Sequence, residues 1–215
     1  MVELHVLRVF VGDDGRHGNP LGIVLDGEAI PDRDRQRVAA ELGFSETVFV
    51  DNAERGEIRI FTPAAELPFA GHPAVGTAWL LKANLLRLPA GEVHAWPEGD
   101  LTWIAGRPEW APEFEHIQLD SPEEIDGLSG MDGDLPAAWA WEDETAGHVR
   151  SRVFPTGLGI DEDEATGAAA VRLGALLGRE LRIRQGRGSV IHVRPREDGT
   201  VEIGGRVILD QVGSV

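Results

Sequence analysis

The sequence predicts an α+β fold made of two related halves, each with a sheet wrapped round one central apolar helix. Predicted strands outnumber predicted helices, and each half contains one unusually apolar helix. The same sequence pattern also precedes both helices, in residues 61–81 and 154–177. It consists of a strand that ends in an aromatic residue and proline, followed by a short acidic turn containing glycine. A helix that is apolar on all sides is buried, so each is expected at the centre of its half.

The first half, residues 1–108, opens with residues 2–11, whose alternation of apolar and polar side chains predicts a half-buried strand. Gly18-Asn19-Pro20 predicts a turn. Residues 31–43 predict an amphipathic helix that ends at Gly43. The first apolar helix is expected at about 73–81, and the remaining strands at 21–25, 46–50, 57–61, 92–96 and 101–105.

The second half, residues 109–215, begins within a cluster of Pro and Trp at 106–112, the best candidate for a domain boundary. Ser121, with Pro122 and Glu124, predicts the start of a short helix. The second apolar helix is expected at about 165–177, and strands at 114–119, 137–141, 148–154, 181–185, 190–194 and 201–203, with an extension to 209 left open. Turns at 197–199 and at Gly204-Gly205 are expected to separate the last strands.

The composition narrows the range of partners. The chain has 215 residues with a formal net charge of −17, and no basic patch of the kind that binds nucleic acid. The acidic surface also argues against docking on anionic lipid, and no apolar run reaches the roughly 18 residues that span a membrane. The N-terminus has the pattern of a strand and not of a signal peptide, so a cytoplasmic location is expected.

The residue types also limit the chemistry. There are no cysteines, which excludes disulfides, thiolate metal sites and cysteine nucleophiles. The seven histidines include no closely spaced pair, and neither a Walker A motif nor a Rossmann fingerprint is present. The sequence therefore predicts neither a metal nor a nucleotide cofactor.

The starts of the two apolar helices are the candidate site. The first N–H groups of a helix lack partners and carry partial positive charge, so two such ends facing each other would hold an anionic ligand. His72 lies at one start, and Asp163 and Thr166 lie at the other. This arrangement predicts a proton-transfer site in a cleft between the halves.

Four motifs occur in order along the chain: Gly18-Asn-Pro20, Phe44-Ser-Glu-Thr47, Phe61-Thr-Pro followed by Ala70-Gly-His-Pro73, and Glu162-Asp-Glu-Ala-Thr-Gly167. Together they resemble the PhzF-like isomerase family of phenazine biosynthesis, which has the diaminopimelate epimerase fold. The resemblance spans roughly the whole chain. It implies two pseudo-symmetric domains with the active site between them, and cofactor-independent proton transfer on a small substrate that carries a carboxylate.

The resemblance also implies roles for particular residues. The family acid/base falls on Glu46, and its other catalytic positions fall on His72 and Asp163. The positions that line the family's site fall on Asn19, Ser45, Gly71 and Gly167. Each has a simpler alternative: Glu46 as a strand-edge glutamate, His72 and Asp163 as helix caps, and the others as turn or cap residues.

Three departures from the family pattern stand out. Ala70 and Asp163 lie near the places where epimerases of this fold have two cysteines, so two-thiol epimerisation is excluded. Glu164 replaces the family's proline, and Ala168 replaces its serine. The chain is also shorter than typical members, chiefly between residues 105 and 154.

Three hypotheses follow from these residues. The first is an isomerase in which Glu46 moves a proton between two carbons of one substrate. The second is a racemase or epimerase that uses Glu46 and Asp163 as opposed bases. The third is a non-catalytic protein that keeps the cleft and binds a small ligand. A homodimer, formed through a sheet edge or the region around Trp110, is a further possibility.

Overall fold

The fold, known from a computed structural model that describes all of residues 1–215, is one mixed sheet with few helices. The strands are β1 (Glu3–Val11), β2 (Asn19–Val24), β3 (Glu46–Asn52), β4 (Glu57–Phe61), β5 (Glu66–Leu67), β6 (Leu85–Leu88), β7 (Gly91–Glu98), β8 (Leu101–Gly106), β9 (Glu115–Gln118), β10 (Pro136–Asp143), β11 (His148–Val153), β12 (Leu181–Gln185), β13 (Ser189–Pro195) and β14 (Val201–Ser214). The α-helices are α1 (Asp32–Leu42), α2 (Gly71–Leu81), α3 (Pro122–Asp126) and α4 (Gly167–Leu177). Three 3-10 helices lie at Gly27–Ala29, Pro108–Trp110 and Thr156–Leu158.

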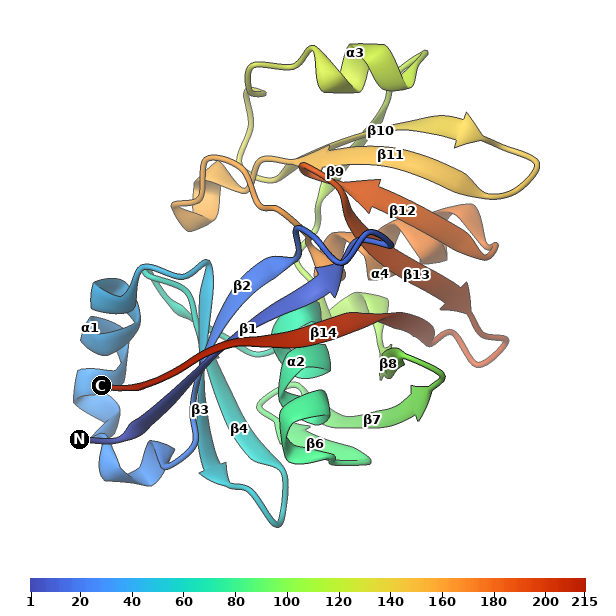
Figure 1. The fold of residues 1–215 in the computed structure, drawn as a ribbon. Helices are drawn as coiled ribbons and strands as arrows, with labels where there is room; N and C mark the ends of the chain where they lie inside the picture. Colours follow the sequence, from blue (N-terminus) through green and yellow to red (C-terminus); the bar gives the residue numbers. More distant parts are fainter.

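The strands enclose α2, and α4 packs on the part of the sheet that contains β13 and β14 (Figure 1). The strand path β1-β2-β3-β4-β6-β7-β8-β14 closes on itself because β14 also pairs with β1, and α2 packs against strands on several sides of this ring. From β14 the path continues through β13, β12, β11, β10 and β9, and α4 packs on β13 and β14.

The same order of strand pairings occurs twice. From β2 to β8 the successive pairs are parallel, antiparallel, parallel, antiparallel and antiparallel. From β9 to β14 the successive pairs follow the same sequence of directions.

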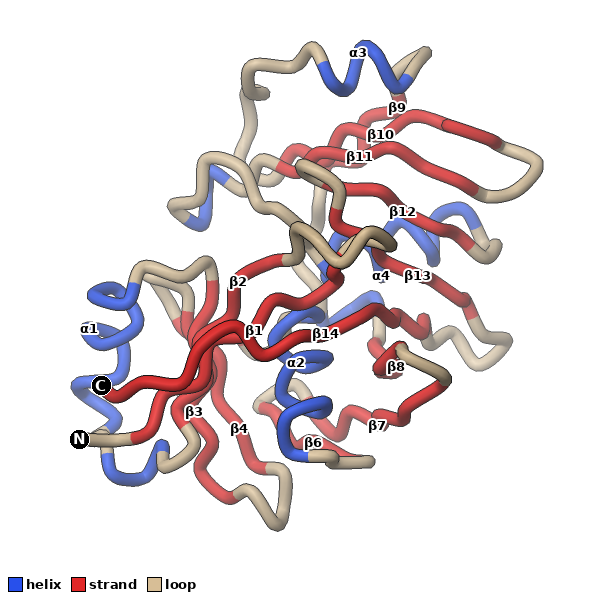
Figure 2. Tube along the Cα trace, viewed as in Figure 1, coloured by secondary structure: helices blue, strands red, loops and turns tan.

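The last strand joins the two regions. β14 pairs with β8 and β13 through its first residues and then with β1 along most of its length. The two chain ends lie together, where Val2 and Val215 exchange backbone hydrogen bonds of 2.9 Å (Figures 1 and 2). Strand β14, from the second half of the sequence, therefore completes the ring around α2.

Most predicted elements are confirmed. Gly43 ends α1 with a φ of +70°, and the Ser121 hydroxyl accepts a hydrogen bond from the Glu124 N–H at the start of α3. Both apolar helices are buried at their starts, α2 from Gly71 and α4 from Gly167. None of the helices has both the length and the apolarity that crossing a bilayer requires.

Two predicted turns are wrong. Asn19 and Pro20 belong to β2, and Gly204 and Gly205 lie within β14. A Cβ atom at Gly204 would lie 2.3 Å from the Trp103 ring, and one at Gly205 would lie 2.4 Å from the Phe10 ring. These glycines are required by close aromatic packing and not by a change of chain direction. Strand β6 was not predicted, α2 begins two residues earlier than expected, and α4 begins two residues later.

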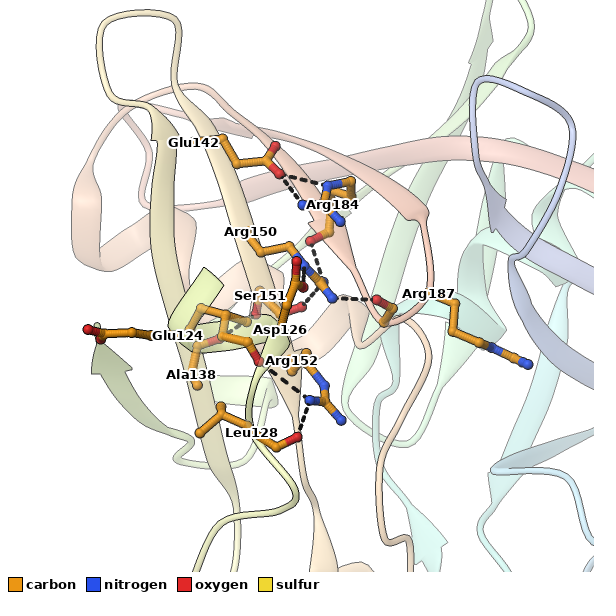
Figure 3. Close-up of polar contacts among 12 residues, drawn as sticks. Glu124, Asp126, Leu128, Ala138, Glu142, Arg150, Ser151, Arg152, Arg184 and Arg187 are labelled. Atoms are coloured by element: carbon orange, nitrogen blue, oxygen red, sulfur yellow. Dashed lines mark hydrogen bonds and ion pairs between the residues drawn. The ribbon is translucent and has the colours of Figure 1, made fainter. Parts of the chain in front are cut away.

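A buried arginine on β11 connects α3, β12 and the turn after β12 (Figure 3). Arg150, on β11, is 4% exposed and donates to Asp126 of α3 and to the carbonyls of Ser151, Arg184 and Gly186. Burial lowers its pKa, and the Asp126 carboxylate opposes this effect. Since every donated bond ends on a different segment, Arg150 ties α3, β12 and the turn after β12 to one another.

Candidate active site

The starts of α2 and α4 touch each other through two glycines. A Cβ atom on Gly71 would lie 2.7 Å from the Cα of Gly167, and one on Gly167 would lie 2.8 Å from the Cα of Gly71. No other residue fits at either position without moving the backbone. The sequence thus brings the two helix N-termini together by leaving out side chains where they meet.

Neither helix start is capped by a side chain. The N-cap residues are Ala70 for α2 and Thr166 for α4, and neither makes a side-chain cap hydrogen bond. The first N–H groups of both helices are therefore free, and the partial positive charges of two helix dipoles converge at one place.

The α4 side of the site is a fully bonded polar network. Asp163 accepts hydrogen bonds from the Asn19 side chain at 2.7 Å and from the Thr166 hydroxyl at 2.6 Å. Gln185 accepts from the Thr166 N–H at 3.0 Å and donates to the Asp163 carbonyl at 3.0 Å. Asn19 also donates to the Ala165 carbonyl at 2.9 Å. These groups are buried and hold one another in fixed positions.

The α2 side holds two buried polar atoms that lack partners. Glu46 begins β3, and its Oε2 lies 3.6 Å from Nε2 of His72. Neither atom has a hydrogen-bond partner within the protein, and the two side chains are 10% and 2% exposed. A distance of 3.6 Å is too long for a hydrogen bond, so both atoms remain available.

Burial sets the protonation of these groups. Burial and the Asp163 charge raise the pKa of Glu46 to about 8, against a hydrogen bond from Ser45 that lowers it. Burial lowers the pKa of His72 to about 3, so its imidazole is neutral at neutral pH. Burial also raises the pKa of Asp163, against the hydrogen bonds from Thr166 and Asn19. The Asn19 amide nitrogen, whose two protons go to Asp163 and Ala165, lies 3.4 Å from Nδ1 of His72.

A small cavity adjoins this network. Its polar lining is Glu46, Asp163 and Thr166, and its other walls are apolar: Leu67, Phe69, Ala70, Pro112, Phe114, Pro155, Leu158, Ile160 and Ala168. Its free volume is about 20 Å³, which is room for about one water molecule.

The predicted site residues therefore fall into two groups. Glu46, Asp163 and Thr166 line the cavity. The others lie behind these three: Asn19 and His72 in direct contact with them, Ser45 with its hydroxyl 3.3 Å from Oδ1 of Asn19, and Gly71 and Gly167 at the helix contact.

The predicted site residues include neither Gln185 nor the apolar walls. Gln185 is 2% exposed at the end of β12, and a glutamine at an inward position of an alternating strand was the available signal. The walls come from loops far apart in the chain, and no local pattern marks them.

A larger cavity of about 520 Å³ lies at the opposite end of α2, lined by Trp79, Trp96, Lys82 and neighbouring side chains. It holds neither of the acidic groups with raised pKa and neither helix N-terminus, so we assign the chemistry to the smaller cavity. No group of three or more histidine, aspartate or glutamate side chains is arranged to hold a metal ion.

Comparison with solved structures identifies the fold. A PhzF-family phenazine biosynthesis protein from Enterococcus faecalis has a TM-score of 0.80 with 21% sequence identity, covering 100% of this chain and 98% of that one. A hydroxyproline epimerase from Agrobacterium vitis has a TM-score of 0.63 with 11% identity, covering 100% and 90%. The fold is thus of the PhzF and epimerase-like class, as predicted.

Sequence relatives give the family. The family model described as phenazine biosynthesis-like protein (PhzC-PhzF) matches residues 9–101. The trans-2,3-dihydro-3-hydroxyanthranilate isomerase of Pseudomonas fluorescens is 32% identical over 216 aligned positions, which cover 79% of this chain and 77% of that protein. The chain therefore belongs to the phenazine biosynthesis-like family and is a PhzF-like isomerase.

Proposed function

We propose that this protein is a cofactor-independent isomerase that moves a proton between two carbons of a small carboxylate-bearing metabolite, with Glu46 as the general acid and base. The observation that carries the proposal is the pair of buried, unpartnered atoms, Glu46 Oε2 and His72 Nε2, 3.6 Å apart beside the cavity. Leaving such atoms unpaired costs roughly 1–3 kcal/mol each, so their retention points to a use in the reaction.

The substrate would be held at both of its ends. Its carboxylate would accept hydrogen bonds from the free N–H groups at the starts of α2 and α4. The rest of the molecule would contact apolar walls such as Phe69, Phe114 and Leu158, which offer no partner for a second charged group. This combination favours a compact and largely apolar substrate body.

The proton transfer would begin with Glu46 as a base. With a pKa of about 8, roughly one tenth of Glu46 is ionised at pH 7. Ionised Glu46 would take a proton from one substrate carbon and return it to another, and neutral His72 would donate its Nε2–H to stabilise the carboxylate while it carries charge. Asp163 would keep the pKa of Glu46 high enough for the return step.

Two halves, residues 1–108 and 109–215, would form the site together. The repeated order of strand pairings supports an origin by duplication. Since the cavity holds about 20 Å³, it must widen to admit a substrate, and closing again would exclude water so that the proton stays on Glu46.

A racemase with Glu46 and Asp163 as opposed bases is the second candidate. Both carboxyl groups line the same cavity, which favours it. However, both Asp163 oxygens already accept hydrogen bonds from Asn19 and Thr166, and these bonds oppose the rise in its pKa. In the third candidate, a ligand-binding protein without turnover, Glu46 would transfer no proton.

Solvent-deuterium exchange tests the proposal. The protein would be incubated in D2O with trans-2,3-dihydro-3-hydroxyanthranilate and a panel of small carboxylates, and C–H signals would be followed by NMR. Double-bond migration, with or without deuterium uptake, that is reduced at least about 100-fold in Glu46→Gln and unchanged in the exposed control Glu66→Gln, supports the isomerase. Exchange at a single carbon with inversion supports the racemase. Tight binding that survives Glu46→Gln, with neither migration nor exchange in either protein, contradicts both.

A further inference from the structure

Glu164 is a mostly buried acidic residue whose carboxylate accepts several hydrogen bonds. It follows Asp163 directly, does not line the cavity, and its side chain is 12% exposed. Its carboxylate accepts hydrogen bonds from the Arg187 N–H at 3.1 Å and from the Ser189 hydroxyl at 2.8 Å. The Arg187 guanidinium adds a longer contact of 3.4 Å.

Ser189 connects Glu164 to the first half of the chain through a second hydrogen bond. It is fully buried at the start of β13, and its hydroxyl oxygen accepts a hydrogen bond of 2.9 Å from the Gly18 N–H. Gly18 immediately precedes Asn19, whose side-chain amide donates to Asp163 at 2.7 Å. A closed ring of covalent and hydrogen bonds, the Glu164 circuit, therefore runs through Glu164, Ser189, Gly18, Asn19 and Asp163.

Close backbone packing accompanies the circuit. A Cβ on Gly12 would lie 2.6 Å from the Gly188 carbonyl oxygen, and one on Gly188 would lie 2.8 Å from the His17 ring. The loop between β1 and β2 thus rests on the turn between β12 and β13.

The same turn is fixed from its other side. Arg150 donates to the Gly186 carbonyl at 2.7 Å, while the Arg187 guanidinium points away from Arg150 (Figure 3). A Cβ on Gly186 would lie 2.5 Å from the Glu164 carbonyl oxygen, so the turn packs directly on Glu164.

We propose that Glu164 is a positioning residue of the proton-transfer site, which holds Asn19 against Asp163 through Ser189 and Gly18. This inference rests on the proposed function of Glu46 and Asp163. Glu164 touches neither the cavity nor Glu46. Its effect on the reaction is indirect, because it fixes the Asn19 amide that donates to Asp163.

The chain offers a matched control. Glu162 also adjoins Asp163 in the sequence, on its other side, and makes a bidentate ion pair of 2.7 and 2.6 Å with Arg152. It takes no part in the circuit. A comparison of Glu164→Ala with Glu162→Ala therefore separates loss of the circuit from loss of a nearby carboxylate.

The experiment measures hydrogen exchange of the Asn19 side-chain amide and the Gly18 N–H by NMR on the full chain. Glu164→Ala and Ser189→Ala should each speed this exchange about tenfold, the effect of removing one hydrogen bond of about 1.4 kcal/mol. Glu164→Gln, which keeps an acceptor for Ser189, should stay within about threefold of wild type, as should Glu162→Ala. Equal exchange in Glu164→Ala and Glu162→Ala would overturn the inference, whatever the catalytic result.

Turnover supplies the second readout. For any panel carboxylate that wild type turns over, Glu164→Ala should lower kcat about tenfold and change KM less than about twofold, because a misplaced Asp163 affects proton transfer more than binding. An unchanged kcat, or an equal loss in Glu162→Ala, would contradict the inference. If wild type catalyses neither double-bond migration nor exchange, the proposed function fails, and the amide measurement still decides whether the circuit fixes Asn19.

Discussion

The two helix starts that meet at Gly71 and Gly167 differ in how their polar groups are satisfied. At the α4 start, Asp163 and Thr166 are bonded to each other, to Asn19 and to Gln185. At the α2 start, Glu46 Oε2 and His72 Nε2 face each other at 3.6 Å with no partner. One start is a rigid support, and the other holds the unsatisfied atoms.

The difference suggests that the two helix starts would have different roles toward a substrate. A network whose members are all paired fixes positions but has little left to offer a substrate. Buried atoms without partners cost stability, and a substrate that pairs with them recovers that cost. The atoms that a substrate would pair with are therefore those on the α2 side.

The largest expected effect is on the pH dependence of stability. The folded-state pKa of Glu46 is raised from 4.5 to about 8. The contribution of its protonated side chain to the free energy of unfolding is therefore fully present below pH 4.5 and is lost as pH rises to about 8. This interval corresponds to about 4–5 kcal/mol. Relative to wild type, Glu46→Gln should gain stability by up to this amount between about pH 4.5 and pH 8.5, measured by urea unfolding. Parallel pH curves for the two proteins would contradict it.

A substitution that pushes the starts of α2 and α4 apart should change the free energy of unfolding by somewhat less than the Glu46 substitution does. In Gly71→Ala the new Cβ would lie 2.7 Å from Gly167 backbone atoms, which should destabilise the protein by about 3 kcal/mol. The control is Gly127→Ala, at a helix end with a φ of −78°, where the nearest atom to a new Cβ is 3.3 Å away. It should change the unfolding free energy by less than about 1 kcal/mol. Similar values for the two variants would mean that the helix contact is not tight.

Breaking the satisfied network at Gln185 should have a moderate effect. Gln185→Ala leaves the buried Thr166 N–H and the Asp163 carbonyl without their partner, at a cost of about 2 kcal/mol. The exposed residue Gln118, which makes no side-chain hydrogen bond, provides the control Gln118→Ala. Denaturant midpoints of both variants give the comparison, and an unchanged midpoint for Gln185→Ala would show that the α4 network is not a support.

The smallest effect is a shift of the pH–rate profile. The Asp163 charge is one of the causes that raise the pKa of Glu46. Asp163→Asn removes this charge, so the rising limb of kcat/KM should move to lower pH, while the amide oxygen of the replacement side chain still offers one acceptor to its neighbours. A limb that stays in place would assign the raised pKa to burial alone.

Much of this site could be predicted from sequence, since the motif residues Asn19, Glu46, His72 and Asp163 do come together. Which of them line the cavity could not be predicted, because that depends on strand register and on loops from residues 112 to 160. Gly204 and Gly205 looked like a turn because a glycine pair is a turn signal, whereas Trp103 and Phe10 require them for packing. The role of Glu164 depends on Ser189 and Gly18, which lie far from it in the sequence.

The most direct test of the central claim is the pKa of Glu46 itself. Carbon-13 NMR of protein labelled at glutamate side-chain carboxyl carbons, with Glu46→Gln to assign the resonance, would follow its titration. We predict a midpoint of about 8, well above the ordinary glutamate value. A midpoint near 4.5 would show that Glu46 is ionised and solvated at neutral pH, and would contradict its assignment as the buried acid and base of this enzyme.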